Sequence, residues 1–83
     1  MLITPEQIRA ARALLKWRAS DLAEHAELSL ASIQRMEQDH GTDRASAKNV
    51  EAVRQTLDGA GVEFIPENGA GVGVRLKRKH HES

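Results

Sequence analysis

The stretch that decides the fold runs from Asp21 to Glu37 and reads DLAEHAELSLASIQRME. Its apolar and small residues recur at helical spacing on both sides of a break at residues 27–29. A connection this short is typical of two helices that cross steeply, not of an antiparallel pair with a broad interface. We therefore predict a helix-turn-helix. The residues expected between its helices and the core are Leu22, Ala23, Ala26, Leu28, Ile33 and Met36.

Capping signals place the ends of the helices. Thr4 and Gln7 form a capping box around Pro5, and Ser46 precedes an apolar stripe of helical spacing. Arg18 stands where the second helix begins, although its side chain cannot accept bonds from the helix amides, and Ser20 is the alternative cap. The predicted helices are 5–16, 19–26, 30–38 and 47–59.

The composition changes after Gly59, where glycines separate two β-prone runs. We predict strands at 62–65 and 72–77, with a turn at Asn68-Gly69. The expected organisation is a helical domain over 1–60, a hairpin over 61–79 and a flexible tail over 80–83. The fold class is mainly α, with four to five helices and a C-terminal β-hairpin.

The composition narrows the classes of function. Eighty-three residues suffice for one compact domain, and the absence of cysteine fits a reducing cytoplasm and removes thiolate chemistry. No signal peptide or membrane-spanning stretch is expected, and the charges of 12 basic and 12 acidic residues cancel. Without a phosphate-binding glycine loop or a plausible catalytic triad, an enzyme is not expected. The four histidines do not form a metal-ligand pattern, so neither a metal nor a cofactor is predicted.

The segments Asp21-Leu22-Ala23-Glu24 and 29–37 resemble the second helix and the recognition helix of phage-repressor and Cro type regulators, the xenobiotic-response-element family. The resemblance covers roughly residues 5 to 58 and implies a lambda-repressor-like bundle. It also implies a prokaryotic, dimeric transcriptional regulator, a repressor or autoregulator, on a palindromic operator of double-stranded DNA. Arg12 and Glu37 match a pair typical of that family, which we expect as a largely buried ion pair. The chain departs from the family at Glu27, where glycine is usual, and at Arg18, where serine or threonine is usual.

The predicted recognition helix has an outward face suited to DNA. When Ile33 and Met36 point into the core, the opposite face carries arginine and glutamine, which can read guanine and adenine, and apolar side chains that can contact thymine methyl groups. Serine hydroxyls and basic residues nearby suit phosphates. The predicted DNA contacts are Arg18, Ser20, Ser29, Leu30, Ala31, Ser32, Gln34, Arg35, Gln38 and Arg44.

The hairpin needs a partner because an isolated two-stranded hairpin is marginal in water and exposes two edges. We predict a homodimer with recognition helices about 34 Å apart. Its expected contacts are Val62, Phe64, Ile65, Val72, Val74 and Leu76.

Two alternatives for the function remain open. The first is an antitoxin that binds DNA and also a toxin protein. The second is a protein-interaction module without DNA binding, which the zero net charge and an apolar Leu30 at a reading position favour.

Overall fold

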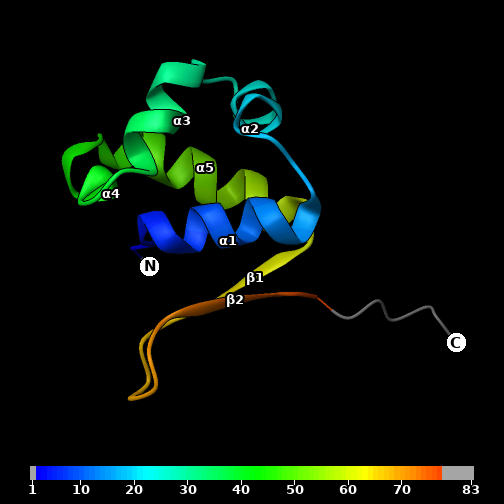
Figure 1. Ribbon diagram of the computed structural model, residues 1–83, viewed down its shortest axis with the longest axis vertical. Coiled ribbons are helices and arrows are strands. Elements are labelled where there is room, and N and C mark those ends of the chain that lie inside the picture. Colours follow the sequence, from blue (N-terminus) through cyan, green and yellow to red (C-terminus); the bar gives the residue numbers. More distant parts are fainter. Residues whose placement is uncertain (1, 78–83) are drawn as a thin grey trace, which may run out of the picture.

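The computed structural model describes residues 2–77, and within them the chain forms five helices followed by one antiparallel hairpin (Figure 1). The predicted fold class is confirmed, whereas the predicted tail at 80–83 and the basic residues after Lys77 lie outside the described residues. No helix within residues 2–77 combines the length and apolar character needed to cross a membrane. The elements are α1 (Pro5–Leu15), α2 (Ala19–Ala26), α3 (Leu30–Met36), α4 (Gly41–Arg44), α5 (Ala47–Gly59), β1 (Val62–Ile65) and β2 (Gly73–Leu76).

The predicted caps account for three of the helix starts. The Thr4 hydroxyl accepts a hydrogen bond from the Gln7 amide at 3.1 Å, and the Gln7 side chain accepts one from the Thr4 amide at 3.0 Å. Ser29 and Ser46 each accept a bond from the amide three residues later, at 3.1 Å. These bonds satisfy amides that have no partner within the helix, and so they determine where α1, α3 and α5 begin.

One core joins the helices and the hairpin. The apolar stripes of α1, α2, α3 and α5 meet in it, and Val62 of β1 is fully buried in the same cluster. The hairpin therefore belongs to the same packed body as the helices. In Figure 1 it lies on one side of α1, while α3 lies at the opposite end of the long axis. The buried apolar residues are Ile3, Ile8, Ala11, Leu22, Ala23, Ile33, Met36, Val50, Val53, Leu57 and Val62.

A buried glutamine fastens the hairpin to α1. The Gln7 side chain is 2% exposed, and its Nε2 donates to the Gly73 carbonyl at 2.9 Å and to the Ile65 carbonyl at 3.3 Å. With Oε1 already in the capping box, both polar atoms of this amide have partners. A buried amide without partners would cost roughly 1–3 kcal/mol, so these bonds favour the docked position of the hairpin.

The hairpin connection contains the turn signal Asn68-Gly69 and is one residue longer than the predicted strands imply. The strands were predicted at 62–65 and 72–77, but β2 covers only Gly73–Leu76, which leaves residues 66–72 as the connection. The Glu67 carboxylate accepts bonds from the amides of Gly69 and Gly71, both of which have a positive φ. Local bonds to one carboxylate therefore shape the loop between the strands.

Candidate nucleic-acid interface

The connection between α2 and α3 turns through one left-handed residue. Glu27 has φ 59° and ψ 41°, and the following amide of Leu28 donates to the Ala23 carbonyl at 3.0 Å. Glycine adopts this conformation without strain, whereas in glutamate it costs on the order of 1 kcal/mol. Glu27, which replaces the glycine usual in the family, therefore adopts a strained left-handed conformation, and the steep corner between the helices is retained.

The start of α2 also tolerates its unusual residue. Arg18 occupies the N-cap position and its side chain caps nothing, but its backbone amide donates to the Asp21 carboxylate at 2.8 Å. Ser20, the alternative cap, lies inside α2 and is exposed. Arg18 and Ser20 are thus both on the surface at the first turn of α2.

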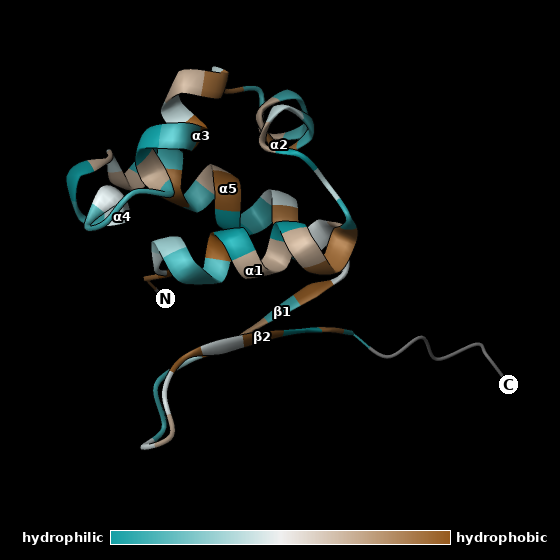
Figure 2. Ribbon diagram, in the orientation of Figure 1, coloured by the Kyte–Doolittle hydropathy of each residue, from teal (hydrophilic) through white to brown (hydrophobic). Residues whose placement is uncertain are grey.

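The two faces of α3 differ in the way its sequence predicts. Ile33 is fully buried and Met36 is 2% exposed, so α3 is anchored on the core through these side chains. Figure 2 shows α3 with polar and apolar segments at the end of the molecule farthest from the hairpin. The remaining predicted contacts on this helix and at its cap are exposed or, for Ser32, half-buried; they are Ser29, Leu30, Ala31, Ser32, Gln34 and Arg35.

The C-terminal boundary predicted for α3 is wrong. The helix ends at Met36, and Gln38, which was placed inside a helix over 30–38, lies in the turn that follows. The reason is the approach of α4, because Gly41 packs so closely that a Cβ atom there would lie 2.1 Å from the Arg35 carbonyl oxygen. The Gln38 carbonyl instead accepts a bond from the Gly41 amide at 2.8 Å.

An ion pair holds the end of α3 against α1. Arg12 Nε and Nη2 donate to the two carboxylate oxygens of Glu37 at 2.7 and 2.8 Å, and Nη1 donates to the Trp17 carbonyl at 3.1 Å. The side chains of Arg12 and Glu37 are 21% and 11% exposed, so the expected largely buried pair is present. Hydrogen bonding to the carboxylate raises the pKa of Arg12 above its ordinary value. Three segments therefore meet at one guanidinium: α1, the α1–α2 connection and the end of α3.

A groove of about 310 Å³ with both polar and apolar lining residues borders the exposed side of α3, between that helix, α4 and the first turn of α5. Arg44, predicted as a DNA contact, lines it from α4, the fifth helix of the bundle, for which no range was predicted. Ser46 and Asn49 were also missed as site residues, although the cap at Ser46 was recognised and placed them at the start of α5. The polar residues that line the groove are Ser32, Arg35, Gln38, Asp39, Arg44, Ser46 and Asn49.

The ion pairs are distributed unevenly over the described part of the chain. Among the described residues, most arginines have a carboxylate partner within 4.0 Å, including the arginines of α1 and of the hairpin. Four cations of that part of the chain have none: Lys16, which follows α1, and Arg35, Arg44 and Lys48, which belong to α3, α4 and the start of α5. The opposing charges nearby are Asp39 in the groove lining and the exposed Asp43 of α4, whose only ion-pair partner is His40. The local excess of positive charge therefore lies beside the exposed face of α3.

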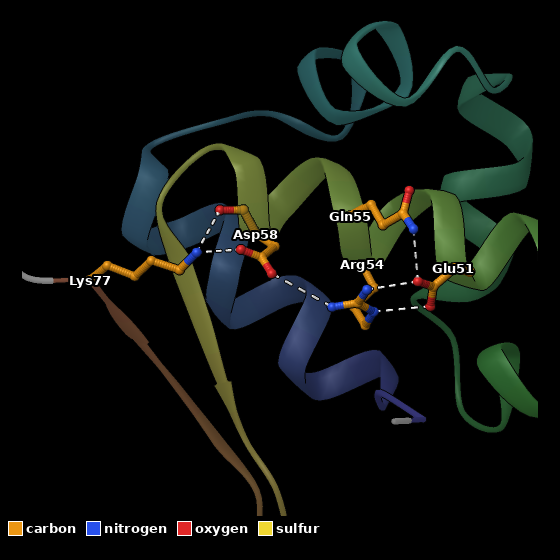
Figure 3. A network of polar contacts seen from close by, with 5 residues as sticks. All are labelled: Glu51, Arg54, Gln55, Asp58 and Lys77. Carbon is orange, nitrogen blue, oxygen red and sulfur yellow. Dashed lines mark hydrogen bonds and ion pairs between the residues drawn. The ribbon is translucent and has the colours of Figure 1, made fainter.

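Figure 3 shows a second charge cluster, which is structural. Arg54 forms two hydrogen bonds with the Glu51 carboxylate, at 2.9 and 2.7 Å, and lies 3.6 Å from Asp58, which also pairs with Lys77 at the end of the hairpin. The bond from Arg54 lowers the pKa of Glu51 to about 2. The cluster connects α5 to the residue after β2, so its cations are engaged within the chain.

The six residues predicted for the dimer interface are not equally accessible. Val62 is fully buried within the chain, which excludes it from direct contact with a partner. Phe64 and Val74 pack partly against the core, and Ile65 is half-buried. Val72 and Leu76 are 41% and 50% exposed. Only the β2 side of the hairpin thus offers exposed apolar side chains of appreciable size.

Within residues 2–77 no group of three histidine, cysteine, aspartate or glutamate side chains is placed to hold a metal ion, and the His80-His81 pair lies outside this range. No protein-family model matches the chain, and no curated protein sequence matches it. The function proposed below therefore rests on the geometry of α2, α3 and the adjoining groove.

Proposed function

We propose that the chain is a sequence-specific DNA-binding transcriptional regulator of the phage-repressor and Cro type, acting as a dimer on a palindromic operator. The observation that carries this proposal is the exposure of Gln34 and Arg35 on a short helix that is anchored through Ile33 and held at its end by Glu37. Such a helix can enter a major groove with its exposed face while its buried face stays packed on the core.

We assign the exposed side chains of α3 to contacts with bases and the adjoining groove to contacts with the DNA backbone. Arg35 would donate two bonds to guanine, Gln34 would pair with adenine, and Leu30 with Ala31 would contact thymine methyl groups. The adjoining groove, with Arg44 and the first turn of α5, would face a phosphate, which fixes position without reading sequence. Occupancy of an operator by this dimer would exclude polymerase.

One observation favours the second candidate, a protein-interaction module. Leu30 is 41% exposed at the start of α3, where an apolar side chain suits either a thymine methyl group or a protein partner such as a toxin. The two functions differ in what Leu30→Ala should do. In a DNA reader it weakens binding only to sites with thymine at the matching position, whereas in an interaction module DNA binding is absent from the start.

The test is a fluorescence anisotropy titration of the purified chain against DNA from upstream of its own gene and against scrambled DNA, at two salt concentrations. Arg35→Ala should lose about 1–3 kcal/mol of discrimination between the two DNAs. Lys48→Ala is the matched control, since loss of an exposed cation at the start of α5 should weaken binding to both DNAs alike and reduce the salt slope by about one.

Two outcomes would overturn the proposal. If the wild-type chain binds both DNAs equally at every salt concentration, it is not a sequence-specific regulator. If Arg35→Ala keeps full discrimination, α3 is not the reader.

A further inference from the structure

We infer that the free edge of β2 pairs with β2 of a second copy about a two-fold axis at Val74, which joins the two hairpins into a four-stranded antiparallel sheet. This inference deepens the dimer of the proposed function and rests on it. It names the strand, the edge and the register of the contact.

The backbone pattern shows which groups of β2 are free to pair. Val62 lies opposite Leu76 and Phe64 opposite Val74. The Lys77 amide donates to the Gly61 carbonyl at 2.8 Å, which extends the same ladder by one pair. Since hydrogen-bonded and non-bonded pairs alternate in an antiparallel ladder, Val74 and Leu76 point their N–H and C=O groups away from β1. No strand among residues 2–77 covers that edge.

The outer edge of β1 is less suited to accept a strand. On β1 the backbone groups of Val62 and Phe64 point to the outer edge. The next residue in this alternation is Pro66, and proline has no N–H to donate. Val62 is also fully buried. Proline at this position protects the β1 edge, so of the two edges β2 is the one left open.

Charge and exposure select the register. With the two-fold axis at Val74, Val72 lies opposite Leu76 of the partner subunit, so the two exposed apolar side chains of this edge cover each other. Arg75 then lies opposite Gly73 of the partner subunit. An axis at Arg75 would instead place two arginines directly opposite, which is unfavourable.

The same axis leaves α3 usable in both copies. The helix-facing side of the hairpin packs on α1 and α5, and α3 lies beyond them (Figure 1). A two-fold axis perpendicular to the joined sheet keeps both helical bodies on one side of it. Both α3 helices then lie on the side of the dimer away from the sheet, where one duplex can reach them.

Disulfide trapping tests this register. The chain has no cysteine of its own, so every disulfide that forms involves an introduced cysteine. Val72→Cys and Leu76→Cys are made as separate full-length chains, mixed, and oxidised with oxidised glutathione. Residues of a hydrogen-bonded antiparallel pair have Cα atoms about 5.5 Å apart, within the range that a disulfide spans. Leu30→Cys is the matched control, because Leu30 and Val72 are both 41% exposed. Circular dichroism checks that each variant keeps its helices.

The expected result is a disulfide-linked heterodimer in the mixture of the Val72→Cys and Leu76→Cys chains, identified by intact mass, with little linkage of either chain to itself. Preferential self-linkage of either chain would overturn the register. No linkage in the mixture, or equal linkage through Leu30→Cys, would overturn the β2 interface.

DNA binding by the wild-type chain is measured separately. Because the contact is small, we expect a dimer that forms only at high protein concentration or on DNA. If specific DNA binding persists while trapping fails even on DNA, only the β2 interface is wrong. If trapping succeeds and specific DNA binding is absent, the dimer stands and the regulator function fails.

Discussion

Replacing the Arg12–Glu37 pair by apolar side chains should destabilise the chain far less than breaking it. In Arg12→Met the Glu37 carboxylate, 11% exposed, loses its ion-pair partner. In Glu37→Leu the guanidinium retains only its hydrogen bond to the Trp17 carbonyl. Removing one partner of a buried ion pair lowers the free energy of unfolding by about 3–5 kcal/mol. A fifth of the Arg12 side chain remains exposed, so Glu37→Leu should fall at the lower end, about 3 kcal/mol.

The double variant leaves neither charge behind. What it loses is the bond to the Trp17 carbonyl, about 1 kcal/mol, so its free energy of unfolding should lie within about 1–2 kcal/mol of the wild type. It should therefore be more stable than either single variant, although it carries both substitutions.

Urea titrations followed by circular dichroism at 222 nm measure all four proteins of this cycle. The midpoints should shift while the m-values stay constant, because the surface exposed on unfolding hardly changes. A double variant whose destabilisation equals the sum of the two single ones would refute the reasoning, since it would mean that the two charges do not stabilise each other.

Three further predictions concern backbone packing and pH. Gly41→Ala should cost about 3 kcal/mol because its Cβ would lie 2.1–2.6 Å from the carbonyl groups at the end of α3, whereas Gly59→Ala, with nothing within 4 Å, should leave the urea midpoint equal or higher. Glu27→Gly should raise the free energy of unfolding by about 1 kcal/mol by relieving the left-handed strain, and an unchanged midpoint would contradict this. Arginine partners lower the pKa of Glu51 to about 2 and also lower that of Glu63, so their stabilisation is complete above the unfolded pKa near 4.5 and is lost as the pH falls toward 2. Thermal unfolding between pH 6 and 2 should show this loss, and 1 M NaCl should reduce it because both carboxylates are exposed.

The sequence predicted those features that depend on neighbouring residues. Ser29 and Ser46 cap their helices because a hydroxyl at that position meets an amide three residues away, and apolar spacing determines which side of each helix is buried. These local rules yielded α1, α2, α5, β1 and β2 with boundaries within one residue. The Arg12–Glu37 pair, 25 residues apart, came from the resemblance, not from a local rule.

The features that the sequence did not predict depend on contacts between distant segments. With four residues, α4 is too short to show a periodic pattern in the sequence. The early end of α3 follows from the close packing of Gly41 against its last turn. Gln7 was recognised as half of a capping box, but its second role joins carbonyls 58 and 66 residues away. Only the folded arrangement shows that one side chain serves both purposes.

The two buried polar contacts of α1 have a joint consequence for recognition. Arg12 holds the end of α3 and Gln7 holds the end of the hairpin, and both belong to one helix of 11 residues. Operator half-sites have a fixed spacing, so a dimer joined through its hairpins needs a fixed path from hairpin to α3. In some proteins a buried ion pair restricts geometry more than it stabilises, and Arg12 satisfies both carboxylate oxygens of Glu37 in this one arrangement. We therefore expect the double variant Arg12→Met with Glu37→Leu to remain folded but to discriminate less between operator and scrambled DNA in the anisotropy titration, and unchanged discrimination would assign the pair to stability alone.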